Sequence, residues 1–197
     1  SVLGDDGRRR NGYAFYNLYQ HPSDGSRSRL VTDYAANFFA GVHALRAGVI
    51  IPAPALQAAM FDLIRDGEYR ALHRPAYNVL ANPFDLRFQN CTEYVLDIVQ
   101  SAIYATRDAA RIKRTLERYY RATRIGVSSG RLQLASLVDA GVSVADQNGL
   151  PKTATFGSLA AYLDAQGLSQ KTHVLEFEHD RLIAVSYTHL TLPTIGC

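Results

Sequence analysis

Apolar and polar positions alternate in short stretches of this chain, and such alternation is typical of β-strands. Residues 13–19 are rich in aromatic side chains, residues 48–52 form an apolar run that ends at a proline, and residues 173–178 mix apolar with polar positions. Residues 142–145 and 153–156 flank an Asn-Gly pair, which favours a hairpin. We expect these strands to form a small, mostly antiparallel sheet.

Between the predicted strands, apolar residues recur at helical spacing. The spacing predicts a helix from Pro54 to near Asp66-Gly67, and further helices over residues 91–102, 108–124 and 158–165. Asp33 also favours a short helix through residues 37–39. Helices packed on a small antiparallel sheet make an α+β fold, which is the fold class we expect.

One predicted helix carries a cysteine in its first turn. Asn90 is a good N-cap because its side-chain oxygen can accept a hydrogen bond from a free backbone N–H. Glu93 can reach back to the Asn90 N–H, as in a capping box. Cys91 then takes the first helical position, where the helix dipole favours thiolate over thiol. Because the thiolate is a nucleophile, Cys91 is the candidate catalytic residue.

A structural interpretation of the same helix stays open, because a lone cysteine is usually a small buried hydrophobe. One face of the helix carries a packing stripe of Cys91, Val95, Ile98 and Ala102. Glu93 and Asp97 lie four residues apart, and we interpret them as a solvated face rather than as an acid–base pair.

Both ends of the chain differ from an ordinary protein sequence. Residues 185–197 resemble the translation of a sequencing-library adapter, so we interpret them as a non-native tail and exclude them from fold prediction. The second cysteine, Cys197, goes with this tail. The chain starts at Ser1 without methionine, and we expect its N-terminus to be incomplete. Residues 1–184 suit a single α+β domain.

Composition narrows the classes of function. The hydrophobic fraction of 47% and charged fraction of 20% are ordinary for a globular protein. No apolar stretch approaches the roughly 18 residues of a transmembrane segment, and a net charge of +3 is too weak to indicate nucleic-acid binding. The histidines show no metal-ligand spacing and the glycines no nucleotide-binding pattern, so we expect no metal and no cofactor. The histidines before the tail are His21, His43, His73, His173 and His179.

Arginines repeat at spacings of four and three along the predicted helix 108–124, opposite Ile112, Leu116 and Tyr119. A stripe of this kind is most often a solvated helix face. Its functional interpretation is a weak binding surface for anions or lipid headgroups. The stripe consists of Arg107, Arg111, Arg114, Arg118 and Arg121.

Several segments together resemble the bacterial domain-of-unknown-function family 2145. The most specific are Asn-Pro-Phe-Asp at residues 82–85 and Asn-Cys-Thr-Glu at residues 90–93. The other resembling segments are residues 17–20, 28–34, 77–81 and 154–167. The resemblance covers most of the chain.

The family is largely uncharacterised and is similar to circularly permuted papain-like folds of the NlpC/P60 and lecithin–retinol acyltransferase type. The resemblance implies that Cys91 is the nucleophile and that Asn17 orients a histidine base. It places that histidine on a strand before Tyr13, and residues 1–12 contain no histidine. We therefore expect this chain to be inactive or severely weakened as a catalyst. The resemblance also implies a secreted or periplasmic protein.

A long connection over residues 77–89 comes directly before the cysteine helix. Connections of this kind often carry specificity, because they lie at the surface of a rigid scaffold. We therefore predict that Asn82, Asp85 and Gln89 line the site.

Two functions from different classes stay open. The first is a thiol hydrolase or acyltransferase that acts on amide or ester bonds, with cell-wall peptides or acylated envelope molecules as substrates by analogy of fold. The second is a non-catalytic envelope binding or scaffold domain, with a structural Cys91 and an arginine stripe that meets anionic headgroups or glycans. An accessible cysteine of low pKa favours the first, and salt-sensitive binding favours the second.

Overall fold

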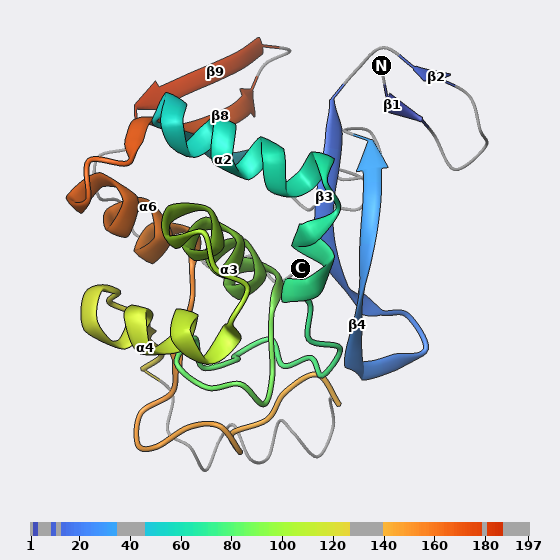
Figure 1. The fold of residues 1–197 in the computed structure, drawn as a ribbon, viewed down its shortest axis with the longest axis vertical. Coiled ribbons are helices and arrows are strands. Elements are labelled where there is room, and N and C mark those ends of the chain that lie inside the picture. The colour runs from blue at the N-terminus through green and yellow to red at the C-terminus, as the bar shows by residue number, and fades with distance from the viewer. Residues whose placement is uncertain are drawn as a thin grey trace.

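The computed structural model describes residues 2–3, 9–10, 13–34, 46–126, 140–178 and 181–186. Its helices and antiparallel strands confirm the α+β class. The helices are α2 (Pro54–Arg65), the 3₁₀ helix η1 (Glu68–Leu72), α3 (Cys91–Tyr104), α4 (Ala109–Tyr119) and α6 (Phe156–Ala165). Helix α3 lies between α2 and α4, with α6 beside it (Figure 1).

The strands form several small ladders instead of the one sheet that the sequence predicted. The strands are β1 (Val2–Leu3), β2 (Arg9–Arg10), β3 (Ala14–His21), β4 (Asp24–Tyr34), β5 (Arg46–Pro52), β6 (Thr123–Arg124), β7 (Lys152–Thr153), β8 (Ser169–Glu178) and β9 (Arg181–Ser186). Strands β1–β2, β3–β4 and β6–β7 pair as two-stranded ladders, and β5–β8–β9 forms a three-stranded sheet. All these pairs are antiparallel.

Helix α3 forms the centre of the hydrophobic core. Its residues Tyr94, Leu96 and Val99 are almost completely buried. They pack in one cluster with Leu18 of β3 and Leu116 of α4. Because neighbours surround α3 on several sides, the N-terminal turn of this helix is fixed by the whole fold and not only by its cap.

The predicted hairpin over residues 142–156 does not form. Residues 140–151 are turns and bends, and only Lys152–Thr153 pairs as a strand, with Thr123–Arg124. The Gln147 side chain holds this irregular segment in place, because its Nε2 donates to the Leu80 carbonyl at 2.7 Å and its Oε1 accepts the Lys152 N–H at 3.0 Å. Tertiary hydrogen bonds have therefore replaced the local pairing that the Asn-Gly pair favoured.

Helix α4 ends at Tyr119 and not near Arg124 as the sequence predicted. Tyr120 leaves the helix in an extended conformation, its ring is 1% exposed, and its hydroxyl lies 2.6 Å from Ser158 Oγ. Burial of this ring and the pairing of β6 with β7 stop the helix early.

Two other predictions concern segments that the structure describes only in part. Asp33 belongs to strand β4, and residues 37–39 lie outside the described ranges. Strand β9 reaches Val185 and Ser186, which belong to the segment that was predicted to be a non-native tail.

Candidate functional site

Helix α3 begins at Cys91, and a side chain caps its first turn. The Asn90 Oδ1 accepts the Glu93 N–H at 2.8 Å. The Asn90 Nδ2 donates to the Val79 carbonyl and to Thr153 Oγ1, both at 3.0 Å. Asn90 is buried, so these bonds tie the helix start to a preceding loop and to β7. The prediction of Asn90 as an N-cap is confirmed.

Cys91 is half-buried at this first helical position, and its Sγ lies 3.9 Å from the Thr92 hydroxyl. Cys91 is disulfide-bonded. The other cysteine of the sequence, Cys197, lies outside the described residues. A cysteine enzyme uses a thiolate as its nucleophile, so Cys91 has to be reduced before its reactivity can be tested.

Glu93 does not close a capping box, because its carboxylate points into a buried ion-pair cluster formed by Arg74, Glu93, Asp97 and Lys113. The Lys113 Nζ lies 2.6 Å from Glu93 and 2.9 Å from Asp97. The Arg74 guanidinium lies 2.5 Å from Glu93 and 3.0 Å from Asp97. Both carboxylates are buried, so their interpretation as a solvated face is wrong. Two cations, Arg74 and Lys113, contact both carboxyl groups.

Burial is the main influence on the pKa of Glu93 in this cluster. Removal from water raises the pKa of Glu93 to about 8, and the charge of Asp97 acts in the same direction. Lys113 and Arg74 act to lower that pKa. The Glu93 Oε2 is buried and has no hydrogen-bond partner among the described residues, which agrees with a raised pKa for this carboxyl group.

Gln89 belongs to the same buried region. Its Oε1 accepts the Arg74 N–H at 2.9 Å, and its Nε2 donates to Asp97 at 2.9 Å and to the Leu72 carbonyl at 3.1 Å. The side chain is completely buried. As placed, Gln89 fixes the segment after η1 to α3 and faces the interior.

Asn82 and Asp85 differ in their surroundings, although both were predicted to line the site. The Asn82 N–H donates to Asp146 Oδ2 at 2.7 Å, and its Nδ2 donates to the Asp146 carbonyl at 2.8 Å. Asp85 lies nearer the surface and pairs with Arg87 at 3.0 Å. Asp146 is buried, which raises its pKa, while the hydrogen bond from Asn82 lowers it. Asn82 therefore anchors the loop to a distant segment.

Asn17 lies in β3, where its Oδ1 accepts the N–H of its neighbour Leu18 at 2.9 Å. This bond is local, and its acceptor atom faces the backbone of its own strand. The orienting role that the resemblance implies for Asn17 stays a prediction.

His73 and His21 each contact a serine hydroxyl. The His73 Nε2 lies 3.0 Å from Ser28 Oγ, and the His73 ring meets the Tyr94 ring edge-on, with 6.4 Å between centroids. Burial and then the charge of Arg74 lower the pKa of His73. His21 lies 3.1 Å from Ser23 Oγ in the β3–β4 turn.

His173 lies in β8, and its buried Nδ1 has no hydrogen-bond partner in the described part of the chain. His43 and His179 lie outside the described residues. Within the described part of the chain, no three His, Cys, Asp or Glu side chains gather in a way that could hold a metal ion.

The arginine stripe divides into residues with partners and residues without. Arg107 precedes α4, forms an ion pair with Glu68 and donates to Ser101 Oγ at 3.1 Å. Arg121 follows α4 and donates to the Tyr120 carbonyl at 3.4 Å. The prediction that five arginines share one helix is therefore wrong at both ends.

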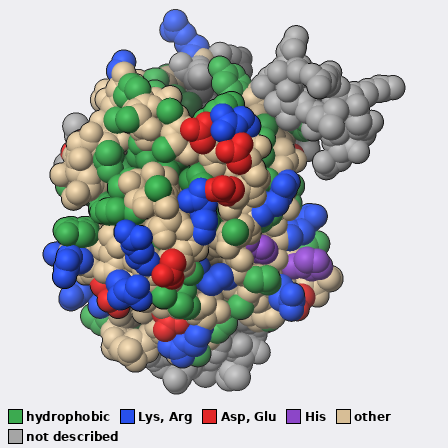
Figure 2. Space-filling model, in the orientation of Figure 1, with side chains coloured by type: hydrophobic (Ala, Val, Ile, Leu, Met, Phe, Trp, Pro, Cys, Tyr) green, Lys and Arg blue, Asp and Glu red, His purple; other side chains and the backbone are tan. Residues whose placement is uncertain are grey.

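Arg111, Arg114 and Arg118 remain on α4, and we call them the α4 arginine face. All three are exposed, and none has an ion-pair partner among the described residues. With Thr115 and Tyr119 they line a shallow hollow. Figure 2 shows Lys and Arg side chains gathered over the region where Figure 1 places α4.

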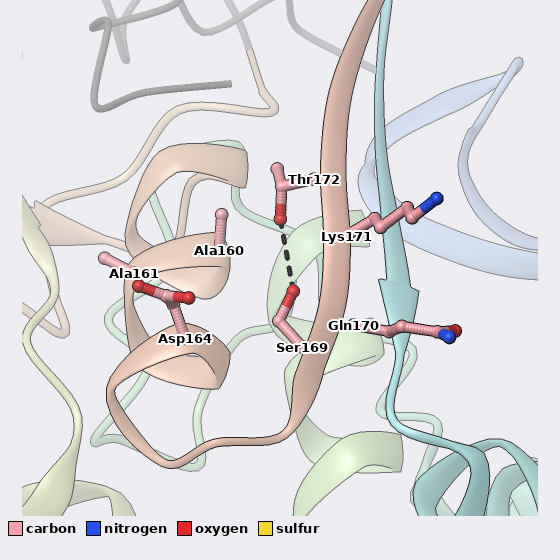
Figure 3. A pocket seen from close by; sticks show the side chains of 7 residues that line it. All are labelled: Ala160, Ala161, Asp164, Ser169, Gln170, Lys171 and Thr172. Carbon is pink, nitrogen blue, oxygen red and sulfur yellow. Dashed lines mark hydrogen bonds between the residues drawn. The ribbon is translucent and has the colours of Figure 1, made fainter. Parts of the chain in front are cut away.

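A second hollow lies between α6 and the start of β8, and Figure 3 shows its lining. On its β8 side, the hydroxyl groups of Ser169 and Thr172 lie 3.3 Å apart (Figure 3). The Lys171 and Gln170 side chains point away from the Asp164 carboxylate (Figure 3). Its charged groups do not converge, so we assign it no ligand.

The sequence did not predict that Lys113 and Arg74 form ion pairs with the buried carboxyl groups of α3. Lys113 lies beside the apolar positions Ile112 and Leu116 on a helical wheel, and that position was a signal that its side chain points inward. Arg74 follows η1 in an irregular segment, where no periodicity indicates which way a side chain points.

Comparison with known proteins gives one match. The model of a protein family described as "Uncharacterized protein conserved in bacteria (DUF2145)" matches residues 2–163. None of the curated proteins and none of the solved structures matches the chain. Among the described residues, no helix is both long and apolar enough for a membrane crossing.

Proposed function

This chain belongs to the DUF2145 family, whose model covers most of it. Because that family is described as uncharacterised, we propose a function from the geometry of the chain itself. The domain is a non-catalytic binding module of the bacterial envelope that takes a phosphate-bearing polyanion on the α4 arginine face. The observation that carries this proposal is the row of exposed arginines without ion-pair partners among the described residues, Arg111, Arg114 and Arg118.

The arginine row is positioned rigidly. On the inner side of α4, Ile112, Lys113 and Leu116 are buried. Lys113 is held by two carboxylates of α3, so α4 has little freedom to rotate about its axis. The guanidinium groups therefore project from a fixed support, which reduces the entropy cost of binding.

Arginine also suits the chemistry of the proposed partner. The guanidinium group is planar, always charged, and presents donors in a fork that matches the oxygens of phosphate. By helix geometry, the first and last arginines of the row are roughly 10 Å apart along the axis. A partner with several phosphates in succession can contact all three at once.

Binding to inorganic polyphosphate tests this function. Isothermal titration calorimetry on the full chain should give an affinity that falls as salt rises, because the contacts are exposed charges. Replacement of Arg111, Arg114 and Arg118 by alanine should abolish measurable binding.

A matched control removes three exposed arginines elsewhere. Arg27, Arg29 and Arg181 are exposed and lie on β4 and β9, so their replacement by alanine changes the net charge equally but leaves α4 intact. Arg107→Ala is a second control, since Arg107 is paired with Glu68. Equal weakening in the α4 variant and the control variant would reject the proposal.

A second candidate is thiol hydrolysis on a permuted papain-like fold, favoured by the position of Cys91 at the start of a capped central helix. A dithiol reductant would first convert the disulfide to two thiols and itself become oxidised. The Cys91 thiolate would attack an acyl carbon, a histidine would take the thiol proton and return it to the leaving amine or alcohol, and water would release the acid. The family resemblance expects that histidine before Tyr13.

A single-cysteine variant tests this candidate. In Cys197→Ser, Cys91 is the only cysteine, and its alkylation rate and ester hydrolysis can be measured after reduction. Hydrolysis that exceeds the rate of the Cys91→Ala, Cys197→Ser double variant would establish the hydrolase and reject the non-catalytic module. Equal rates would reject the hydrolase.

We also propose a secreted or periplasmic location, which the family resemblance favours and which would bring the α4 arginine face near the anionic molecules of the envelope. Fractionation of the bacterial host, with antibody detection of the native protein, tests this location. Recovery of the protein with cytoplasmic markers would contradict it.

A further inference from the structure

Helix α4 presents its arginines on a narrow arc opposite its buried side. At about 100° per residue, Arg111, Arg114 and Arg118 fall within roughly 60° of one another on the helical wheel. The buried residues Ile112, Lys113 and Leu116 occupy the opposite side. The row is therefore straight, points directly outward and is parallel to the helix axis.

The hollow along this row is shallow and open, and no buried polar side chain lines it. Its lining consists of the three arginines with Thr115 and Tyr119, and all are exposed or half-buried. A small free anion would keep most of its water there and gain little. A planar array of many phosphates would contact the whole row at once.

Tyr119 follows Arg118 in α4, about 100° farther around the helix; it lines the same hollow as the arginines and is 49% exposed. A tyrosine ring has an apolar body and a polar tip, and it is enriched where membrane headgroups meet the hydrocarbon. Tyr119 and the arginines of the same short helix thus combine the two residue types that suit a headgroup layer.

Resting on the proposed function, we infer that the polyanion is the surface of an anionic phospholipid bilayer. The α4 helix lies along that surface, its arginines contact lipid phosphates, and the Tyr119 ring enters the headgroup layer. Each arginine held at such a surface strengthens binding about fivefold, so the row of three contributes roughly a hundredfold.

Vesicle flotation tests the inference with the full chain. The protein should float with equimolar phosphatidylglycerol and phosphatidylcholine, and not with phosphatidylcholine alone. Replacement of Arg111, Arg114 and Arg118 by alanine should weaken flotation roughly a hundredfold. Replacement of the same residues by lysine should preserve it, because attraction to a charged surface requires the charge and not the guanidinium fork. The Arg27, Arg29 and Arg181 alanine variant should float like the unchanged chain.

A fluorescent reporter separates insertion from simple attraction. The chain contains no tryptophan, so Tyr119→Trp places a single reporter in the hollow that the arginines line. Its emission should shift to shorter wavelength with phosphatidylglycerol vesicles and not with polyphosphate. Tyr13→Trp is the control, since Tyr13 is 87% exposed on the segment before β3 and should show no shift.

The outcomes distinguish this inference from the proposed function. Binding to polyphosphate without flotation would overturn the bilayer inference and leave the polyanion function intact. Loss of both would overturn both. Flotation that the alanine variant retains would overturn the assignment of the bilayer contact to α4, and circular dichroism of each variant confirms that the comparison is between folded proteins.

Discussion

Lys113 lies on the inner side of α4, and its ammonium group contacts Glu93 and Asp97 on α3 at 2.6 and 2.9 Å. A buried pair of this kind adds little net stability over apolar residues of the same volume, because desolvation of the charges opposes their attraction. Removal of Lys113 is different, since it leaves the buried carboxyl groups of Glu93 and Asp97 with Arg74 as the one cation of the cluster.

Replacement of Lys113 by methionine should therefore cost about 3–5 kcal/mol of unfolding free energy. Chemical denaturation followed by circular dichroism measures the change. Arg118→Met is the matched control on the outer side of the same helix, and it should change stability by less than about 0.5 kcal/mol. Equal effects of the two substitutions would show that the cluster does not hold α4.

Glu93 gives the molecule a specific pH dependence. The folded chain holds the Glu93 proton up to a pKa of about 8, whereas the ordinary value is 4.5. The contribution of this group to stability is therefore fully present below pH 4.5 and is lost as pH rises to about 8.

Replacement of Glu93 by glutamine should remove this loss while it preserves the shape of the side chain. Denaturation midpoints measured across the same pH range should fall more steeply with rising pH for the unchanged chain than for Glu93→Gln. Parallel curves would contradict the raised pKa.

At the scale of elements, α3 and α4 begin with the same kind of cap in different surroundings. Asn90 is 4% exposed and also bonds Val79 and Thr153, so it connects three segments. Asp108 is exposed, and its Oδ1 accepts the Arg111 N–H of its own helix at 3.1 Å. The first cap supports the fold, and the second supports mainly its own helix.

Asn90→Ala should therefore destabilise more than Asp108→Ala. The exposed cap is worth about 1 kcal/mol. The buried cap adds unsatisfied partners, each worth about 1–3 kcal/mol, so its loss should reach roughly 2–4 kcal/mol. Urea denaturation of both variants measures the difference, and losses of the same size would refute the connecting role of Asn90.

At the scale of the whole molecule, α6 approaches the β5–β8–β9 sheet at Gly48. A Cβ atom at this position would lie 2.5 Å from the Phe156 ring, which is closer than two carbon atoms can pack. The glycine thus permits the first residue of α6 to contact the sheet directly.

Gly48→Ala should cost about 1–3 kcal/mol, because the added methyl group forces the Phe156 ring to move. Gly126→Ala is the control, since nothing lies within 4 Å of a Cβ at that position. The double variant with Phe156→Leu should lose less than the sum of the two single losses. Additive losses in thermal unfolding would show that the two residues do not compete for space.

The predicted helix boundaries were correct where a few neighbouring residues decide the structure. Pro54 occupies the first turn of α2, Gly67 follows that helix with a φ of 74°, and Cys91 begins α3. The end of α4 could not be predicted, because the burial of Tyr120 against α6 competes with helix propagation. The arginine stripe was predicted in part, since helical spacing gave Arg111, Arg114 and Arg118 correctly and could not show the partner of Arg107.

The sequence by itself determined the α+β class, the family and the starts of α2, α3 and α4, because caps, turns and periodicity depend on residues a few positions apart. Only the tertiary structure decided where the charges lie. Glu93 meets Lys113, twenty positions later, and Arg74, nineteen positions earlier. Contacts at such separations arise from the packing of α3 against its neighbours, and no local pattern encodes them. The same packing turned one cation of α4, Lys113, inward and left Arg111, Arg114 and Arg118 exposed.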